Sequence, residues 1–479
     1  MVWFYEILRG FYLKLKNLSN FRISDWLQYP TMPDIKNILT SGVLDSMPNR
    51  GLHETFLGLL LLIFVLYVKS AKSLQQSKVF IQYSLIVFGC LVFLFYSSSL
   101  IELVLAWVAL NVSLYGLMLQ GSRYSIEAAT KYFLLGAAST GLLFFGFFLH
   151  FVEYGSVEYS TFSFLISSGI SALPVLSLTQ LVAFICVLTA FLFKLGVYPF
   201  HFYLTAVYDG VRYDMLGIIT LPVKCITYFA MLNFVQSYGY AAVTFHSGFV
   251  FLGLGSLFMG AYGAYLQQKL RSFWAYSYIG SMGFVFLGFN VSSATLVTYV
   301  GTQYFMIYLF TWALVYWWFN AARLAESITT ADGLARIRYT EIRYIAELSS
   351  TASIAPKYRL PAFVLIFSLA GVPPTLGFWA KFCVLSSLTN TGFGYLVLLS
   401  VLLLLPLSAY NYLRLVRAMS FQMDELYEGS SVSAVFYFNN YYSFDPFIRL
   451  CIWLVLAFVP LSYYLHLSFV EDFGFGLTE

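Results

Sequence analysis

Four ionisable residues lie inside long apolar runs of this chain: Glu102, Lys194, Lys224 and Lys381. Their surroundings read LIELVLAW, FLFKLGVYPF, ITLPVKCITYF and GFWAKFCVL. A charged side chain in a bilayer core costs at least about 2.5 kcal/mol, so a residue kept there is a candidate functional residue. A lysine in a low-dielectric site loses part of the stability of its charged form, and a nearby glutamate restores it. A Glu–Lys pair whose separation changes is therefore a candidate proton switch, and lysines joined by water are a candidate relay.

Simpler explanations compete with this hypothesis. Lys381 lies near enough to the end of its run to reach the membrane surface along its own stem. Glu102 could serve a purely structural ion pair. His201, two residues after Pro199, is a further candidate for the relay, and its alternative is an ordinary helix-end residue.

The composition excludes a soluble globular domain. Of 479 residues, 60% are hydrophobic and only 10% are charged, and the mean hydropathy is +0.78. The apolar runs are continuous over about 20 residues, the length that an α-helix needs to cross a bilayer. The fold class expected is an all-α polytopic membrane protein with about twelve transmembrane helices.

The expected spans are 54–70, 76–93, 95–120, 128–151, 179–203, 214–237, 243–266, 272–291, 296–321, 360–386, 391–417 and 447–468. They divide the chain into an N-terminal tail that could lie along the membrane surface (1–53), a peripheral first span (54–75), two five-helix halves (76–237 and 238–417), and a loop with the final span (418–479). Residues 1–20 do not resemble a cleavable secretory signal.

The basic residues of the loops between spans lie on one side of this topology, whereas the N-terminal tail (1–53) carries six basic residues on the other side. The expected loops that return to the side of residue 53 contain no Lys or Arg. The opposite loops carry all of the following: Lys72, Arg123, Arg212, Lys269, Arg271, Arg323, Arg336, Arg338, Arg343, Lys357 and Arg359. The positive-inside rule places this side toward the cytoplasm or the mitochondrial matrix. The two long segments on this side, 322–359 and 418–446, are expected to be surface loops that could contact partners.

Each half carries an interrupted helix at the same position. Because each half has five spans, the second is inverted relative to the first. The fourth span of the first half contains Gly196 and Pro199 after Lys194, and its counterpart contains Pro373 and Pro374 before Lys381. Proline removes a backbone donor and breaks the helix. Paired broken helices in inverted halves are the best sequence indication of a transport site.

No cofactor site is visible in the sequence. The five cysteines are isolated and the five histidines do not cluster, so no metal or iron–sulfur site is expected. The sequence also lacks the glycine-rich motifs that bind nucleotides. A nucleic-acid partner is not expected.

Four motifs, however, match a known family. They are EAATKYFLLGAASTGLLFFG (127–146), FKLGVYPFHF (193–202) followed by VYDG (207–210), RSFWAYSYIGSMGF (271–284) and SLAGVPPTLGFWAKF (368–382). In sequence, order and spacing they resemble the antiporter-like subunits of proton-pumping NADH dehydrogenase, respiratory complex I.

The resemblance implies roles for the candidate residues. Glu102 would pair with Lys194, Lys224 would connect the two halves, and Lys381 would exchange the proton at the end of the relay. Lys381 favours the members that carry a lysine, rather than a glutamate, at the second break. Three departures from the family pattern stand out. Ser281 occupies the position of a family histidine, where water or Tyr278 could serve instead, and YLTA (203–206) replaces a W-x-P-D sequence. The twelve expected spans also lack the first two of the fourteen spans of bacterial-type members.

The resemblance also implies the setting. The chain would lie in the mitochondrial inner membrane among other membrane-arm subunits, with cardiolipin as a lipid partner. NAD, FMN, iron–sulfur clusters and ubiquinone would belong to other subunits. The alternatives are a subunit of an Mrp-type cation/proton antiporter, a non-pumping structural subunit, and, less well supported, a transporter of organic solutes.

Overall fold

The computed structural model describes residues 78–121, 123–155, 158–159, 178–238, 246–289, 294–329, 335–353, 356–373, 375–389, 394–420 and 435–438. The chain divides into two compact units, residues 1–57 and 58–479, and every described residue belongs to the second. The expected tail 1–53 and the expected spans 54–70 and 447–468 lie outside the described residues.

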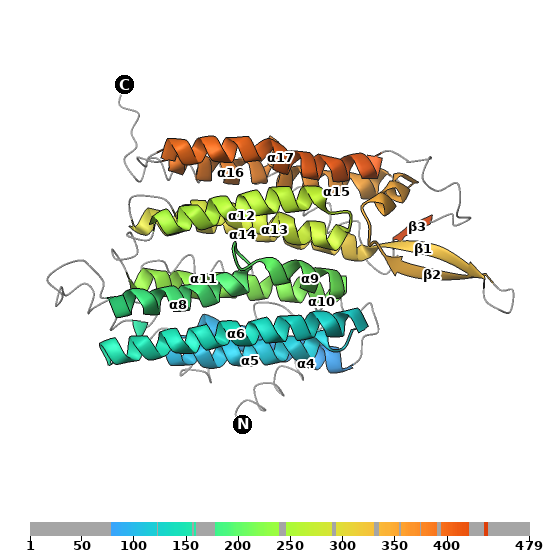
Figure 1. Ribbon diagram of the computed structural model, residues 1–479. Helices are drawn as coiled ribbons and strands as arrows, with labels where there is room; N and C mark the ends of the chain where they lie inside the picture. The colour runs from blue at the N-terminus through green and yellow to red at the C-terminus, as the bar shows by residue number, and fades with distance from the viewer. Residues whose placement is uncertain are drawn as a thin grey trace, which may run out of the picture. The chain divides into compact units, whose positions relative to one another are not determined.

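The helices of the first half follow the expected spans, with two interruptions. They are α4 (Lys78–Phe95), α5 (Leu100–Met118), α6 (Arg123–Tyr154), α8 (Leu178–Leu195), α9 (Phe202–Gly210), α10 (Tyr213–Thr220) and α11 (Pro222–Ser237). The span expected at 179–203 ends early as α8, and the chain resumes as α9 after a break (Figure 1). The next span is divided at Leu221 into α10 and α11.

The second half repeats this order. Its helices are α12 (His246–Leu266), α13 (Leu270–Leu287), α14 (Ala294–Ala321), α15 (Pro356–Ala370), α16 (Leu376–Leu388) and α17 (Gly394–Ser420). The span expected at 360–386 is broken into α15 and α16. In the part of the chain that is described, six helices are long and apolar enough to cross a bilayer. The chain is thus an α-helical polytopic membrane protein.

Small residues bring α12 and α13 into close contact. A Cβ atom added to Gly260 would lie only 2.4 Å from the Cα of Gly280 on the facing helix. Ser256, one turn before Gly260, is fully buried. The small residues of the run GLGSLFMGAYGA (253–264) therefore let the backbones of α12 and α13 approach each other closely, as small residues do in membrane helices. Helix α13 also packs on α9 and α14, so it connects the two halves.

The polar segments contain a small sheet that the sequence analysis did not foresee. Strands β1 (Ala322–Thr329) and β2 (Ala335–Glu341) form an antiparallel hairpin, and β3 (Val435–Phe438) pairs with β1 on its other side. Segments 322–359 and 418–446, expected to be loops, are thus joined by backbone pairing. The strands lie beyond the helix ends (Figure 1). They were not predicted because they fall outside the long apolar runs from which the helices were predicted.

Candidate functional site

The break after α8 is a left-handed turn at Gly196. Its φ is +72°, a conformation that glycine adopts without the steric cost of a Cβ. The N–H groups of Gly196 and Val197 both donate to the carbonyl of Leu192, which closes the helix as a Schellman motif. The carbonyl of Phe193 then accepts from the Tyr203 hydroxyl at 2.8 Å. Backbone polarity inside the membrane is therefore satisfied by a side chain beyond the break.

The break after α15 has the same construction. Gly371 has a φ of +82°, and the N–H groups of Gly371 and Val372 both donate to the carbonyl of Phe367. The expected break residue Pro373 follows in the irregular segment, and Pro374 lies outside the described residues. Helix α16 then returns so close to α15 that a Cβ on Gly377 would overlap the Ser368 carbonyl oxygen, at 1.7 Å. Matching positions of the two halves thus have matching backbone geometry.

Lys194 lies in the last turn of α8 and is 4% exposed. Its ammonium donates to the amide oxygen of Asn111 on α5 and, at 2.5 Å, to the Tyr132 hydroxyl on α6. It also lies 5.6 Å from the ring centre of Trp107. All of these partners are uncharged. Hydrogen bonds and aromatic rings replace the water around the buried ammonium, and within the described residues no carboxylate forms an ion pair with it.

Glu102 occupies a different place from the one that the resemblance implied. Its carboxylate accepts from the backbone N–H groups of Ser98 (2.8 Å) and Ser99 (3.3 Å), and Ser99 caps the Glu102 N–H in return. This is a capping box at the N-terminus of α5. Nine residues separate Glu102 from Asn111, about 13.5 Å along a helix. In the described structure the expected Glu102–Lys194 ion pair is therefore not formed, and Asn111 and Tyr132 stand in its place.

Lys224 lies beside a third interruption, between α10 and α11. Pro222 begins α11, and its missing N–H separates that helix from α10. The Lys224 ammonium is 2% exposed and lies 3.5 Å from the carbonyl oxygen of Leu195, the last residue of α8. It also lies only 3.3 Å from the ring centre of Tyr278 on α13. The expected connecting lysine thus contacts both the first break and a helix of the second half.

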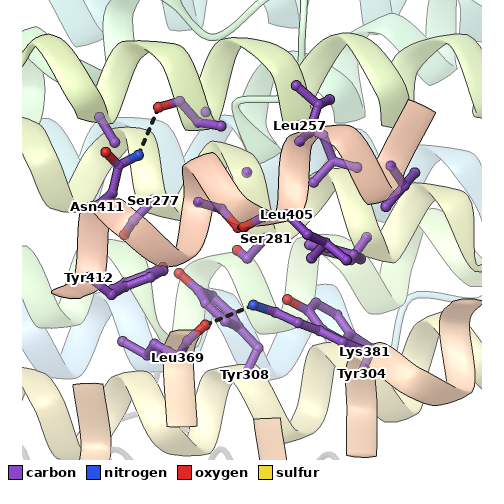
Figure 2. A pocket seen from close by; sticks show the side chains of 18 of the residues that line it. Leu257, Ser277, Ser281, Tyr304, Tyr308, Leu369, Lys381, Leu405, Asn411 and Tyr412 are labelled. Carbon is purple, nitrogen blue, oxygen red and sulfur yellow. Dashed lines mark hydrogen bonds between the residues drawn. The ribbon is translucent and has the colours of Figure 1, made fainter. Parts of the chain in front are cut away.

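Lys381 caps the second break. Its ammonium donates to the carbonyls of Leu369 at 3.0 Å and Ala370 at 2.7 Å, the last two residues of α15. A cation at a helix C-terminus is favoured by the partial negative charge of the unpaired carbonyls. The side chain is 8% exposed and faces a small cavity (Figure 2). The Lys381 side chain is thus buried inside the protein and does not extend to the membrane surface, which was the alternative.

His201 contributes less to this arrangement. It precedes α9 as the N-cap residue without a capping hydrogen bond from its side chain, and its ring lies 5.9 Å from that of Tyr198. Pro199, which follows Tyr198, lies in the same break. The structure thus places His201 at the expected break, whereas the groups that contact Lys194 come from α5 and α6.

The sequence did not predict that Asn111 and Tyr132 are partners of Lys194, and it indicated Tyr278 only as a possible substitute for the family histidine, not as a contact of Lys224. Tyr132 lies within the EAATKYF motif, and Tyr278 lies within the AYSYIGSMGF motif, so both belonged to recognised segments. Asn111 is a polar residue in an apolar run, which is a weak signal by itself. Only the packing of α5, α6 and α13 shows that these side chains reach lysines on other helices.

The comparisons with known proteins agree with this architecture. A family model described as NADH:quinone oxidoreductase/Mrp antiporter, transmembrane, matches residues 97–405. The chain belongs to this antiporter family. The family resemblance predicted from the four motifs is thereby confirmed.

Relatives within the antiporter family are NADH dehydrogenase subunits. NADH-quinone oxidoreductase subunit N of Hydrogenovibrio crunogenus is 32% identical over 68% of this chain and 65% of that protein. NADH-ubiquinone oxidoreductase chain 2 is 29% identical in Oenothera berteroana, over 63% of this chain and 58% of that protein. The same chain of Arabidopsis thaliana is 29% identical over 63% and 56%. The chain therefore spans less than two thirds of these relatives. The sequence motifs resembled chain 2 best within the family, and these relatives confirm that prediction.

Solved structures share the fold of the antiporter family. A chain of respiratory complex I from Thermus thermophilus superposes with a TM-score of 0.64 at 24% identity, over 85% of this chain and 84% of that one. A chain of the Mrp complex from Dietzia sp. superposes with a TM-score of 0.61 at 18% identity, over 76% and 66%. At these identities the likeness concerns the fold alone.

Proposed function

We propose that this chain is a proton-translocating, antiporter-like subunit of the membrane arm of NADH:quinone oxidoreductase. The observation that carries the proposal is the placement of three buried lysines at helix interruptions, where each ammonium contacts uncharged oxygens or aromatic rings. A buried ionisable group inside a membrane is costly and marks an ion pathway. The names of the relatives support the assignment to NADH:quinone oxidoreductase.

The lysines can hold and release protons because the groups around them can form hydrogen bonds with both the charged ammonium and the neutral amine. At the second break, the C-terminal carbonyls of α15 attract the Lys381 ammonium. When the proton leaves, the neutral amine can still donate hydrogen bonds to the same oxygens. No carboxylate has to be separated from this lysine first. Proton release therefore leaves no buried anion behind.

Lys194 differs in its partners. Asn111 and Tyr132 can accept from the ammonium, and the Tyr132 hydroxyl can donate to the neutral amine by rotating its O–H bond. In the proposed mechanism these two side chains replace the carboxylate of a Glu–Lys switch. Glu102 then acts at the N-terminus of α5, where it holds the helix rather than the proton.

The proposal includes the setting of the chain. The partners are the other membrane-arm subunits, and the NAD, FMN, iron–sulfur and ubiquinone chemistry belongs to other subunits. The location is the mitochondrial inner membrane, with the basic loops facing the matrix, so that protons move from the matrix to the intermembrane space. The mitochondrial names of two relatives and the one-sided distribution of Lys and Arg support these assignments. Cardiolipin is the proposed lipid partner.

A second candidate is a subunit of an Mrp-type cation/proton antiporter. It is favoured by the family description, which covers both groups, and by the shared fold with the Mrp complex. Mild-detergent native electrophoresis of membranes, with mass spectrometry of the bands, separates the two. We expect this chain in a very large complex with NADH dehydrogenase activity. Migration in a small complex without that activity would favour the Mrp assignment.

Variants of the lysines test pumping itself. We expect Lys194→Ala and Lys381→Ala to lower the number of protons translocated per electron in the assembled complex. Lys269→Ala is the matched control, because this lysine is about half exposed and outside the membrane. A normal proton-to-electron ratio in both buried variants would leave only a structural, non-pumping role.

A further inference from the structure

A cavity of about 40 Å³ lies beside Lys381, between helices of the second half. By size it has room for roughly three water molecules. Figure 2 shows the Lys381 amino group and the hydroxyl ends of Tyr304 and Tyr308 directed into the same space. Ser281 and Asn411 also line the cavity. Most of its surface is apolar, so these few polar groups define where water can bind.

Asn411 brings a buried hydrogen-bond acceptor without a partner among the described residues to this cavity. Its side-chain nitrogen donates to the Ala261 carbonyl at 2.8 Å. Its side-chain oxygen is buried and has no partner within the described structure, and the residue is only 2% exposed. A buried acceptor without a donor costs about 1–3 kcal/mol. A water molecule bound in the adjoining cavity would donate to this oxygen and remove the cost.

Tyrosines connect this cavity to Lys224. The Lys224 ammonium lies over the Tyr278 ring, 3.3 Å from its centre. The Tyr278 hydroxyl is buried and, in the described part of the chain, unpartnered. The ring of Tyr308 on α14 is centred 6.1 Å from that of Tyr278, and Tyr308 lines the cavity. A row of two phenols therefore runs from the connecting lysine to the water site beside Lys381.

Ser281 lies one turn after Tyr278 on α13. Its hydroxyl donates to the Tyr278 carbonyl at 2.6 Å, so its own proton is engaged and its oxygen is available to the cavity as an acceptor. The position is the one where the family resemblance implies a histidine. Serine lacks the two ring nitrogens that let histidine receive a proton on one side and release it on the other. A proton that passes this position must therefore be carried by another group.

We propose that Tyr278, Tyr308 and water in this cavity form the proton link between Lys224 and Lys381. The inference rests on the proposed proton-translocating function and specifies its path. In each step a phenol oxygen receives a proton from the Lys224 side as its own O–H proton leaves to the next acceptor. The phenol is neutral before and after, so charge and protons balance without an oxidant or reductant. Ser281 and Asn411 position the water as acceptors.

The test uses Tyr278→Phe and Tyr308→Phe in the assembled complex, reconstituted in proteoliposomes. Each substitution keeps the ring, and with it the packing and the contact with Lys224, but removes the hydroxyl. Tyr228→Phe is the matched control, because Tyr228 is also a buried tyrosine with an unpartnered hydroxyl among the described residues, and it does not line the cavity. Proton translocation is measured per assembled complex, with assembly quantified by native electrophoresis.

We expect each of the two variants to slow proton translocation about tenfold or more, the scale of a lost proton-transfer group, and Tyr228→Phe to leave it unchanged. Ser281→His added to Tyr308→Phe should restore much of the rate, because a titratable ring then faces the cavity. Normal pumping in both tyrosine variants, while Lys381→Ala abolishes it, would overturn the link but leave the proposed function. Normal pumping in Lys381→Ala as well would overturn both. If Tyr308→Phe fails to assemble, the Ser281→His double variant is measured instead. If that double variant assembles but does not pump, the link is also overturned.

Discussion

Substitution of Gly371 by alanine should impair proton exchange at Lys381 more than it impairs stability. The position has a φ of +82°, and an added Cβ would lie 2.8 Å from Cδ and 3.1 Å from Nζ of Lys381. Gly155 offers a control with the same backbone problem and none of the crowding. Its φ is +65°, and a Cβ there would meet nothing within 4 Å.

The two substitutions share one energy term and differ in another. Placing a Cβ in the left-handed region costs about 1–2 kcal/mol at either glycine. At Gly371 the new methyl also forces the Lys381 stem away from the break. The ammonium then weakens or loses its hydrogen bonds to Leu369 (3.0 Å) and Ala370 (2.7 Å). Hydrogen bonds to charged groups contribute about 1.5–3 kcal/mol each, so loss of both corresponds to about 3–6 kcal/mol at most.

Each 1.36 kcal/mol of added barrier slows a step tenfold. If about half of this lost interaction, about 1.5–3 kcal/mol, must be regained during proton exchange, the Gly371→Ala complex should pump about tenfold to a hundredfold more slowly. The assay is the initial rate of proton uptake by proteoliposomes, normalised to assembled complex, with thermal denaturation measured in parallel. Gly155→Ala should show the same small loss of thermal stability and near-normal pumping. Equal pumping by the two variants would refute the argument that close approach of Gly371 holds Lys381 in place.

Three further predictions concern other contacts. Asn111→Asp places a carboxylate about 3 Å from the Lys194 ammonium, an attraction of roughly 5 kcal/mol at an effective dielectric constant of about 20. Because this ion pair holds the proton on Lys194, proton uptake should slow without loss of assembly. Unchanged or faster uptake would contradict this prediction. The Asp209 carboxylate raises the pKa of Lys269, first by accepting its hydrogen bond at 2.6 Å and then by charge attraction. Because the raised pKa belongs to a cation, this stability is complete below the ordinary lysine value of about 10.4 and is lost as pH rises through the folded value. The pair is exposed and worth less than about 1 kcal/mol. Asp209→Asn should therefore lower the melting temperature slightly at pH 7 and not at all once the pH exceeds the folded-state pKa of Lys269; a difference that persists after Lys269 is deprotonated would argue against the pair. Arg414 donates to three carbonyls at the end of α12, at 2.7, 2.8 and 3.1 Å. Arg414→Lys loses the planar arrangement of donors and should cost about 1–3 kcal/mol in denaturant melts; a midpoint equal to that of the unchanged chain would show that the fork is dispensable.

The sequence by itself determined the membrane class, the helix order and the two helix breaks. These properties follow from composition and local chemistry. Continuous apolar runs of about 20 residues form helices in a bilayer because every backbone polar group must be paired within the segment. Gly196 and Gly371 end helices because they can adopt a positive φ. The interruption at Pro222 was not predicted, since 214–237 was expected to be one continuous span. The sequence also singled out the three lysines, since a buried cation is rare enough to be read without a structure.

Tertiary structure decided which groups those lysines meet. Asn111 and Tyr132 reach Lys194 from helices that precede it by 83 and 62 residues, and no periodicity along one helix encodes such a contact. The same applies to Tyr278 over Lys224 and to the small sheet that joins β1 with β3. The family resemblance implied that Glu102 pairs with Lys194, yet the capping box at the start of α5 provides the hydrogen bonds of its carboxylate. Local sequence fixes where a helix begins and breaks, whereas the partner of a buried charge depends on how separate helices pack around it.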